Sequence, residues 1–519
     1  MNRSTEELTV QKARSYRRYL QAAGLIAGPI MAGVCFFLLP LTYVDLKGNI
    51  VEFSVAGRAT LAAMVWMATW WLTESTHISV TALLPLALFP LLGIADMKEA
   101  AAPYAHPLIF LFLGGFILAL SMSRWGLDRR ISLITLRMVG TRPTRMVAGF
   151  MIATAVLSAF VSNTATTAMM LPIALSVIGL VAANREQIDA KCISNFSTCL
   201  MLAIAYSASV GGMITIVGTP PNVFLVSFLR NTIDEPNQMN VSFARWLLLG
   251  IPLACLFLPS IWLLLSKVLY PVKFETIPGG DRLILTELKK LGSMNRGEWV
   301  TFILFLLTAG MWITLPLLKQ IHLTVGEGEI YPLEKLTDPG IVMLTAVLLF
   351  VIPTGDKERR FTMDWETAVR LPWGVLVLFG GGLSLAAAVD RNGVAPFIGG
   401  FSSYVAGVPP IALVLAITTV IVFLTELTSN LATTAAVIPI LAGLAPGLGM
   451  HPYDLIVPAT LAASCAFMLP VATPPNAIVF GSGKITIGQM ARAGFWLNLL
   501  GILLVTAVSS ALVKVVFGH

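Results

Sequence analysis

The sequence predicts an all-α, polytopic membrane protein, and three observations support this fold class. The 519 residues are 56% hydrophobic and 12% charged, with a mean hydropathy of +0.83, which leaves too little polar surface for a soluble protein. The apolar runs are about 20 residues long and rich in Leu, Ile, Val, Phe and Gly, as in helices that span lipid and unlike the alternating strands of an outer-membrane barrel. The chain also contains an internal repeat of polar, helix-breaking motifs.

The same composition excludes several functions. The net charge of +7 comes from Lys and Arg in short loops beside apolar segments, which is a topology signal and not a nucleic-acid-binding surface. The five cysteines form no CxxC pair and the five histidines are scattered, so we expect neither disulfides nor a metal cluster. Because the chain has no HExxH, no GxSxG and no histidine cluster, we do not expect an enzyme.

The N-terminal quarter is expected to cross the membrane four times. Basic residues in segment 1–18 place the N-terminus in the cytoplasm. The first apolar run, Leu20 to Tyr43, is too long for a signal-peptide core and lacks a cleavage pattern, so we expect it to be retained as the first helix. The further spans are expected at 58–74, 78–94 and 107–123.

Two polar motifs are each written twice in the chain. Ser162-Asn163-Thr164 opens a segment that recurs 267 residues later as Ser429-Asn430-Leu431. Gly218 to Asn222, with the sequence Gly-Thr-Pro-Pro-Asn, returns at Ala472 to Asn476 as Ala-Thr-Pro-Pro-Asn. Single Ser, Thr or Pro residues in membrane helices are usually packing residues or kinks, but two duplicated signatures indicate a site.

The two copies differ in charge, and this predicts an inverted repeat. The stretch from Arg124 to Arg145 holds six arginines around an Ile/Leu stripe, as in an amphipathic helix on the cytoplasmic surface. Its partner at the 267-residue offset, 391–411, has one Arg and no Lys. Since positive charge marks the cytoplasmic side, the second copy is expected outside.

The Ser-Asn motifs are expected at the tips of re-entrant hairpins. Met146 to Val161 and Asn163 to Leu180 are each too short to cross a core of about 30 Å, so together they would enter and leave on one side. Ser162 would cap the second helix of this pair. Pro409 to Thr428 and Asn430 to Ala445 repeat the pattern. With two such hairpins the chain makes eleven crossings, with the N-terminus inside and the C-terminus outside.

The Thr-Pro-Pro-Asn motifs are expected to interrupt two further helices. Pro220 and Pro221 remove two amide donors, so a span from Cys192 to Leu229 must unwind near Gly218. The span from Tyr453 to Phe480 should unwind likewise at the second motif. Each break offers a helix N-terminus, which favours an anion, and free carbonyls, which suit a small cation.

These paired motifs resemble the divalent anion/sodium symporter family, which includes sodium-coupled dicarboxylate and citrate transporters. The resemblance covers almost the whole chain in order and spacing. It implies a homodimer in which a transport domain, formed by both hairpins and helices five, six, ten and eleven, moves as an elevator against a scaffold of helices one to four and seven to nine. The corresponding segments are 1–18 (cytoplasmic), 19–145 (scaffold), 146–270 (transport), 271–408 (scaffold) and 409–519 (transport).

The resemblance also implies two sodium sites and one substrate site. The first sodium site corresponds to Ser158, Ser162 and Asn163 with the backbone of Gly218, and the second to Thr425, Ser429 and Asn430 with the backbone of Ala472. Substrate carboxylates would contact Asn163, Thr164, Thr219, Asn430, Thr473 and Pro474. Leu431 departs from the pattern, because many bacterial members have Thr there, and it makes the local wall apolar. Ser158 and Thr425 are themselves 267 residues apart, which supports the paired assignment.

The predicted function is sodium-coupled import of a C4 dicarboxylate, such as succinate, malate or fumarate, across the inner (plasma) membrane. The partners are then sodium ions, the dicarboxylate and membrane lipid. A sodium-independent dicarboxylate exchanger of the same fold remains an alternative, and so does a transporter of sulfate or tricarboxylates, because helix dipoles recognise negative charge without counting carbons. An anion channel is not favoured by a midplane that is interrupted twice.

Overall fold

The computed structural model is almost entirely helical. It describes residues 3–44, 49–184, 188–231, 241–277, 279–325, 328–355, 360–402 and 407–518. Within these residues the only strands form two short antiparallel hairpins, β1 (Thr42–Val44) with β2 (Ile50–Glu52) and β3 (Leu323–Val325) with β4 (Gly328–Ile330). The predicted all-α fold class is therefore confirmed.

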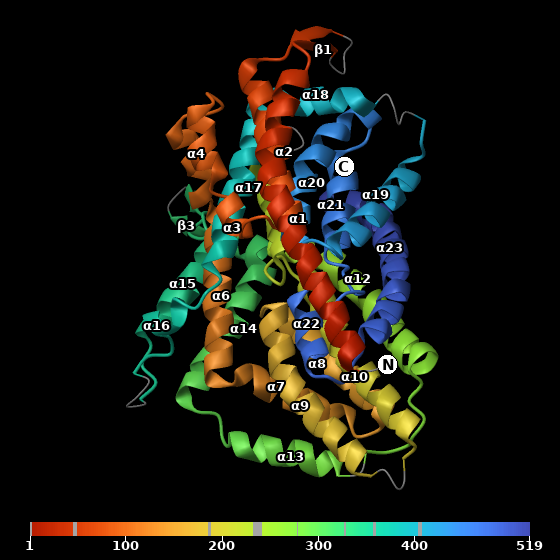
Figure 1. Ribbon diagram of the computed structural model, residues 1–519. Coiled ribbons are helices and arrows are strands. Elements are labelled where there is room, and N and C mark those ends of the chain that lie inside the picture. Colours follow the sequence, from red (N-terminus) through yellow and green to blue (C-terminus); the bar gives the residue numbers. More distant parts are fainter. Residues whose placement is uncertain are drawn as a thin grey trace. The chain divides into compact units, whose positions relative to one another are not determined.

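The chain forms two compact units, and each unit combines segments from both sequence repeats. Unit 1 comprises Met1–His106, Phe224–Met239 and Pro372–Ala463. In it, α1 lies along α2 (Figure 1). Its helices are α1 (Arg3–Leu38), α2 (Val55–Thr73), α3 (Ile78–Thr81), α4 (Leu84–Leu91), α5 (Met97–Ala101), η1 (Ala102–Ala105), α17 (Trp373–Arg391), α18 (Val394–Gly400), α19 (Pro410–Thr425), α20 (Asn430–Leu444), η4 (Pro446–Leu448) and α21 (Pro452–Ala463).

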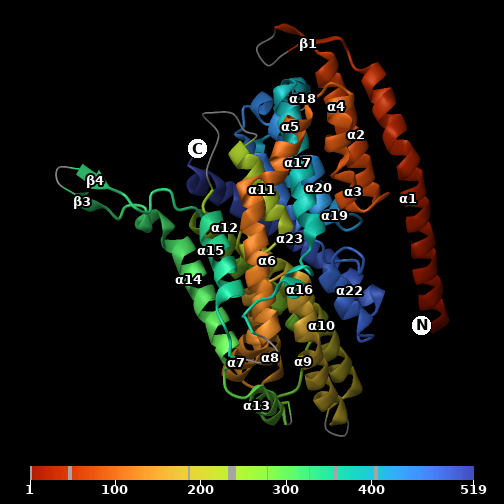
Figure 2. The same ribbon diagram turned by 90° about the vertical axis from the view of Figure 1, so that its left-hand side faces the viewer.

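Unit 2 comprises Pro107–Val223, Asn240–Leu371 and Ser464–His519. Figure 2 shows α6, α14 and α15 side by side in it. Its helices are α6 (Pro107–Trp125), α7 (Leu127–Val139), α8 (Pro143–Ser158), α9 (Asn163–Ala183), α10 (Ala190–Ile214), α12 (Phe243–Leu263) with the π-helical η2 (Leu264–Leu269), α13 (Gly280–Leu291), α14 (Arg296–Leu318), α15 (Asp338–Val351), α16 (Trp365–Ala368), α22 (Pro474–Gly481) and α23 (Ile487–Phe517). Helix α11 (Pro220–Asn231) is divided between the two units.

Helix α10 forms the centre of unit 2. It is buried around almost its whole circumference, with 94% of the residues in its apolar window inside the protein. Such a helix needs partners around its circumference, and α8, α9, α12 and α22 supply them. The glycines of α10 permit close contact, because a Cβ at Gly211 would lie 2.4 Å from the carbonyl oxygen of Ala155 in α8.

The predicted duplication appears in the helix boundaries. Helices α8 and α19 begin and end at positions that differ by 267 residues, and α9 and α20 begin at the same offset. Gly126 precedes α7 with φ 71° and ψ 18°, and Gly393 precedes α18 with φ 71° and ψ 19°. A positive φ at both positions favours glycine, so the repeat preserves backbone conformation as well as sequence.

Two of the predicted boundaries are wrong. The stretch 78–94 is not one helix: α3 ends at Thr81 and α4 begins at Leu84, where Pro85 in the first turn lacks the amide hydrogen that would continue the helical bonding. Helix α9 does not stop at Leu180 but reaches Ala183, so its 21 residues are long enough to span a membrane. The length argument for a re-entrant hairpin therefore fails for this helix.

Among the described residues, eight helices are long and apolar enough to cross a membrane by length and composition. Shorter apolar helices, which include α8, α15, α19 and α20, accompany them. The chain thus has the helices of a multi-pass membrane protein. The count of eleven crossings stays a prediction.

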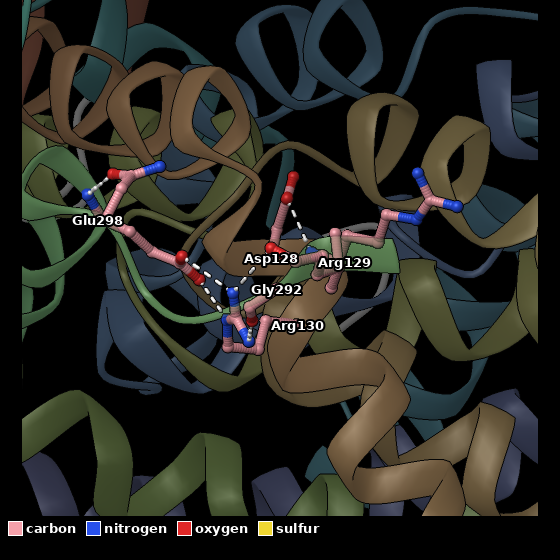
Figure 3. Close-up of polar contacts among 7 residues, drawn as sticks. Asp128, Arg129, Arg130, Gly292 and Glu298 are labelled. Carbon is pink, nitrogen blue, oxygen red and sulfur yellow. Dashed lines mark hydrogen bonds and ion pairs between the residues drawn. The ribbon is translucent and has the colours of Figure 1, made fainter. Parts of the chain in front are cut away.

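The amphipathic stretch after Arg124 forms a helix, α7, that charged contacts hold within unit 2. Arg130 forms an ion pair with Glu298 at the start of α14 and donates to the carbonyl oxygen of Gly292 at 2.9 Å (Figure 3). Arg129 pairs with Glu287 of α13 at 2.6 Å. Asp128 accepts from Ser123 and from the Arg129 backbone, while burial raises the pKa of its carboxyl group.

The Arg130–Glu298 pair predicts a measurable loss of stability. The side chains are 13% and 3% exposed, so Arg130→Met leaves a buried carboxylate without its cation. We expect the variant to lose about 3–5 kcal/mol, and the double variant Arg130→Met/Glu298→Gln to recover much of that loss. Melting temperatures in detergent measure the loss in the single variant and the recovery in the double variant. Equal melting temperatures for the single and double variants would contradict this account.

Candidate functional site

The first Ser-Asn motif forms a turn between two helices, as predicted. Helix α8 ends at Ser158 and α9 begins at Asn163. Ser162 occupies the N-cap position, and its Oγ accepts a hydrogen bond from the backbone N–H of Ala165 at 3.3 Å. Ser429 occupies the equivalent position before α20, but its side chain makes no capping hydrogen bond. The capping prediction is confirmed for the first motif.

Three oxygen atoms of different kinds meet beside the first turn. Ser158 Oγ lies 2.6 Å from Asn163 Oδ1 and 2.8 Å from the carbonyl oxygen of Ala208 in α10. A hydroxyl group carries one proton, so Ser158 donates to only one of these oxygens at a time. We call this group of atoms the first oxygen cluster.

The second repeat builds the same arrangement in unit 1. Thr425 Oγ1 lies 2.8 Å from Asn430 Oδ1 and 2.9 Å from the carbonyl oxygen of Ala463. This second oxygen cluster again has one proton for two acceptors. Neutral hydroxyl, amide and backbone oxygens beside interrupted helices are the ligands that membrane transporters offer to sodium.

The first Thr-Pro-Pro-Asn motif interrupts a helix, as predicted. Helix α10 ends at Ile214, and α11 begins at Pro220. The Asn222 amide donates to the carbonyl oxygens of Thr215 at 2.8 Å and Gly212 at 3.2 Å, which the interruption leaves without helical partners. Trp246 of α12 donates its indole N–H to the Met213 carbonyl at 3.1 Å.

Thr215, which lies within this break, forms two further hydrogen bonds. Its hydroxyl donates to the carbonyl oxygen of Ala159, just after α8, at 2.5 Å. The same hydroxyl accepts from the Gly218 N–H at 3.0 Å. Thr215 therefore links the break to the Ser-Asn turn.

The second motif makes a longer break. Helix α21 ends at Ala463 and α22 begins only at Pro474. The Asn476 amide donates to the carbonyl oxygens of Ala466 and Leu469, each at 3.1 Å, which repeats the role of Asn222 at an offset of 254 residues. Leu469 stands where the first repeat has Thr215, so this segment lacks the internal hydroxyl link.

Glycine allows the backbone to approach Asn163. A Cβ at Gly212 would lie 2.6 Å from Asn163 Oδ1 and 3.0 Å from its Nδ2. A Cβ at Gly218 would lie 2.6 Å from the Gly212 carbonyl oxygen and 3.0 Å from that of Ala159. No larger residue fits at these two positions without moving the oxygen atoms around Asn163.

The predicted site residues are divided between the two units. Unit 2 contains Ser158, Ser162, Asn163, Thr164, Gly218, Thr219, Ala472, Thr473 and Pro474, and unit 1 contains Thr425, Ser429, Asn430 and Leu431. Within unit 2, α22 packs against α9 and α10. Thr219, Leu431 and Thr473 are buried, and Thr164 and Pro474 are exposed.

Sequence reasoning gave no role to several residues that support this site. Asn222 and Asn476 donate to backbone carbonyls at the two breaks. An asparagine recurs at the end of both motifs, and this recurrence was a sequence signal for the shared role. Trp246 and Gly212 act across long sequence distances and have no repeated counterpart in sequence. Among the described residues, no three His, Cys, Asp or Glu side chains gather as a metal site.

Comparisons with known proteins agree with the motif resemblance. A family model described as the sodium:sulfate symporter transmembrane region matches residues 38–518. The chain is 42% identical over 501 residues to the sodium-dependent dicarboxylate transporter SdcS of Staphylococcus saprophyticus, covering 96% of this chain and 92% of the relative. It is 41% identical over 504 residues to SdcS of Staphylococcus aureus, with the same coverage.

Two solved transporter structures share the fold. MtrF of Neisseria gonorrhoeae aligns with a TM-score of 0.59 at 11% identity, over 95% of this chain and 94% of its own. YdaH of Alcanivorax borkumensis aligns with a TM-score of 0.53 at 14% identity, over 97% and 98% of the two chains.

The packing of Gly212 predicts a specific loss of cation binding. In Gly212→Ala the new methyl group displaces the Asn163 amide from Ser158, so binding of radioactive sodium to purified protein should fall at least tenfold, an effect of about 1.4 kcal/mol. Gly179→Ala in α9 is the matched control, because nothing lies within 4 Å of its Cβ position. Unchanged sodium binding in Gly212→Ala, or an equal loss in the control, would contradict the prediction.

Proposed function

The chain belongs to the sodium:sulfate symporter family, the divalent anion/sodium symporters, and we propose that it couples import of a C4 dicarboxylate such as succinate, malate or fumarate to an inward flow of sodium ions. The observation that carries this proposal is the duplicated oxygen cluster beside two interrupted helices. Near-full-length similarity to sodium-dependent dicarboxylate transporters supports sodium as the coupling ion.

Two sodium sites are proposed, one for each repeat. The first consists of Ser158, Ser162 and Asn163 with the backbone of Gly218, and the second of Thr425, Ser429 and Asn430 with the backbone of Ala472. The support is chemical: in each cluster the hydroxyl oxygen lies 2.6 to 2.9 Å from an amide oxygen and from a backbone carbonyl oxygen, and it has a single proton for the two acceptors. A small cation removes the repulsion among such lone pairs.

The substrate site is proposed at the two Ser-Asn turns and the Thr-Pro-Pro-Asn motifs. Its members are Asn163, Thr164, Thr219, Asn430, Leu431, Thr473 and Pro474. Neither motif pair contains Lys or Arg, so carboxylates meet neutral donors and helix N-termini, each worth about 0.3–1 kcal/mol. The start of α22 supports this location, because Thr473 caps it through the N–H of Asn476 and α22 packs against α9.

Sodium dependence follows from this charge balance. A site without cationic side chains holds a dianion weakly until bound sodium ions compensate its charge. Sodium also fixes Asn163 and Asn430, which the proposal places in contact with both ion and substrate. Binding of sodium therefore raises affinity for the dicarboxylate, and the dicarboxylate raises affinity for sodium by the same factor.

The transport cycle proposed here is an elevator movement in a homodimer in the plasma membrane. The transport domain would comprise 146–270 and 409–519, and the scaffold 19–145 and 271–408. Eleven crossings, with two re-entrant hairpins, place the N-terminus in the cytoplasm and the C-terminus outside. Helices α7 and α18 occupy equivalent positions in the repeats, but α7 carries three arginines and α18 carries no charged residue, and this contrast supports an inverted arrangement.

The proposal predicts sodium-driven uptake by the purified protein. Labelled succinate should enter proteoliposomes only with an inward sodium gradient, and Asn163→Ala or Asn430→Ala should reduce uptake to background. Gly179→Ala serves as a substitution in α9 away from the turn. Undiminished uptake in potassium alone would refute the coupling, and release of preloaded substrate by external dicarboxylate without sodium would identify an exchanger. Uptake of sulfate or citrate in preference to succinate would reassign the substrate.

Leu431 provides a test of the substrate position. It follows Asn430 at the start of α20, where Leu431→Thr adds a hydroxyl donor beside the proposed carboxylate. A hydrogen bond to a charged group should lower KM for the dicarboxylate roughly tenfold. Leu441→Thr, a buried position later in the same helix, should leave KM unchanged. The placement is wrong if KM is the same in Leu431→Thr and in the unmodified protein.

A further inference from the structure

The two interrupted helices differ in the hydrogen bonds that hold their breaks. Thr215 closes the first break from within, whereas the second break, Ser464 to Thr473, has Leu469 at the corresponding position. A backbone carbonyl that is buried away from water needs a donor. Asn476 of the motif donates to the carbonyl oxygens of Ala466 and Leu469 in the longer segment, and the Phe467 carbonyl takes its donor from elsewhere in the fold.

Tyr206 of α10 supplies such a donor. Its Oη donates to the carbonyl oxygen of Phe467 at 2.9 Å, and Met490 O lies farther away at 3.5 Å. Both aromatic side chains are fully buried. Their ring centroids are 5.2 Å apart with an interplanar angle of 69°, an edge-to-face contact that reinforces the hydrogen bond.

Helix α23 also packs closely against the Phe467 carbonyl. A Cβ at Gly494 would lie 2.2 Å from the Phe467 oxygen and 2.3 Å from its carbonyl carbon. Only glycine permits this approach without moving the backbone. Phe467 is therefore fixed between Tyr206 of α10 and Gly494 of α23, all within unit 2.

The position of Tyr206 along α10 connects this contact to the first oxygen cluster. Ala208, two residues later, provides the carbonyl oxygen that lies 2.8 Å from Ser158 Oγ. Gly212, at the end of the next turn, packs against Asn163. Phe467 lies four residues after Ala463, whose carbonyl belongs to the second oxygen cluster. One rigid helix thus contacts the first cluster and holds the segment that continues from the second.

We infer that Tyr206 is a positioning residue that couples the two sodium sites. By fixing the Phe467 carbonyl to α10, its hydroxyl makes the second unwound segment follow any adjustment of α10 when an ion binds at the first cluster. The two ions then bind cooperatively. This inference rests on the proposed function, and it adds a residue that touches neither ion nor substrate.

The test compares two tyrosines that each donate to a backbone carbonyl: Tyr206 to Phe467 in the second break, and Tyr270 to Gln489 near the start of α23. Tyr206→Phe removes the hydroxyl that donates to Phe467 O at 2.9 Å and lies 3.5 Å from Met490 O. Tyr270→Phe removes a hydroxyl that donates to Gln489 O at 2.7 Å, outside the unwound segment. Initial rates of succinate uptake into proteoliposomes are measured against sodium concentration at saturating substrate.

We expect Tyr206→Phe to raise the half-saturating sodium concentration roughly threefold to tenfold and to lower the Hill coefficient toward one. KM for succinate at saturating sodium should stay within about twofold of the unmodified value, since Tyr206 lies outside the substrate site. Tyr270→Phe should reproduce the unmodified sodium curve. A purely structural role for Tyr206 would lower the melting temperature or maximal rate and leave the Hill coefficient unchanged, which would overturn the inference.

A glycine pair tests the same carbonyl independently. Gly494→Ala should displace Phe467 and reduce cooperativity as Tyr206→Phe does, whereas Gly488→Ala in the same helix has no atom within 4 Å and should not. If Tyr206→Phe is not recovered as a folded protein, the two glycine variants test whether the position of Phe467 controls the cooperativity. Equal curves for all four variants overturn the coupling alone, while sodium-independent uptake by the unmodified protein overturns the proposed function.

Discussion

The structure depends on one constraint: a helix that is interrupted within an apolar interior must find new partners for the backbone groups it releases. Asn222 and Asn476 meet this requirement in the same way, each donating to the carbonyl oxygens that lie 7 and 10 residues earlier in the chain. The paired prolines after each break lack amide hydrogens, so they release fewer donors. What remains is a set of neutral oxygen atoms beside a Ser-Asn or Thr-Asn pair, and these are the two places that we propose for sodium.

The internal repeat provides two such oxygen clusters, and the segments beside them differ between the repeats. In the first repeat the Thr215 hydroxyl joins the break to the preceding turn and to Gly218, and Trp246 of α12 donates to the Met213 carbonyl. In the second repeat the unwound segment is longer and is held by α10 and α23 through Phe467. An element that depends on its neighbours for its shape responds to them. This asymmetry gives a physical basis for the proposal that ion binding in one repeat changes the ion affinity of the other.

Much of this organisation was predictable because it depends on short sequence motifs that occur in both repeats. The breaks at Pro220 and Pro474, the cap at Ser162 and the partnership of Ser158 with Asn163 follow from motifs whose residues lie close together in sequence. Contacts such as Tyr206 with Phe467, or Trp246 with Met213, join distant segments and carry no periodic signal. The overestimated span at 78–94 and the underestimated length of α9 show that hydropathy alone does not locate helix ends.

The central claim is that sodium completes the site to which the dianion binds. It is tested most directly by the melting temperature of the purified protein with succinate, citrate or sulfate, each in sodium chloride and in potassium chloride. Because a ligand stabilises the state that binds it, the account predicts that succinate raises the melting temperature in sodium and not in potassium. An equal rise in both salts would contradict it.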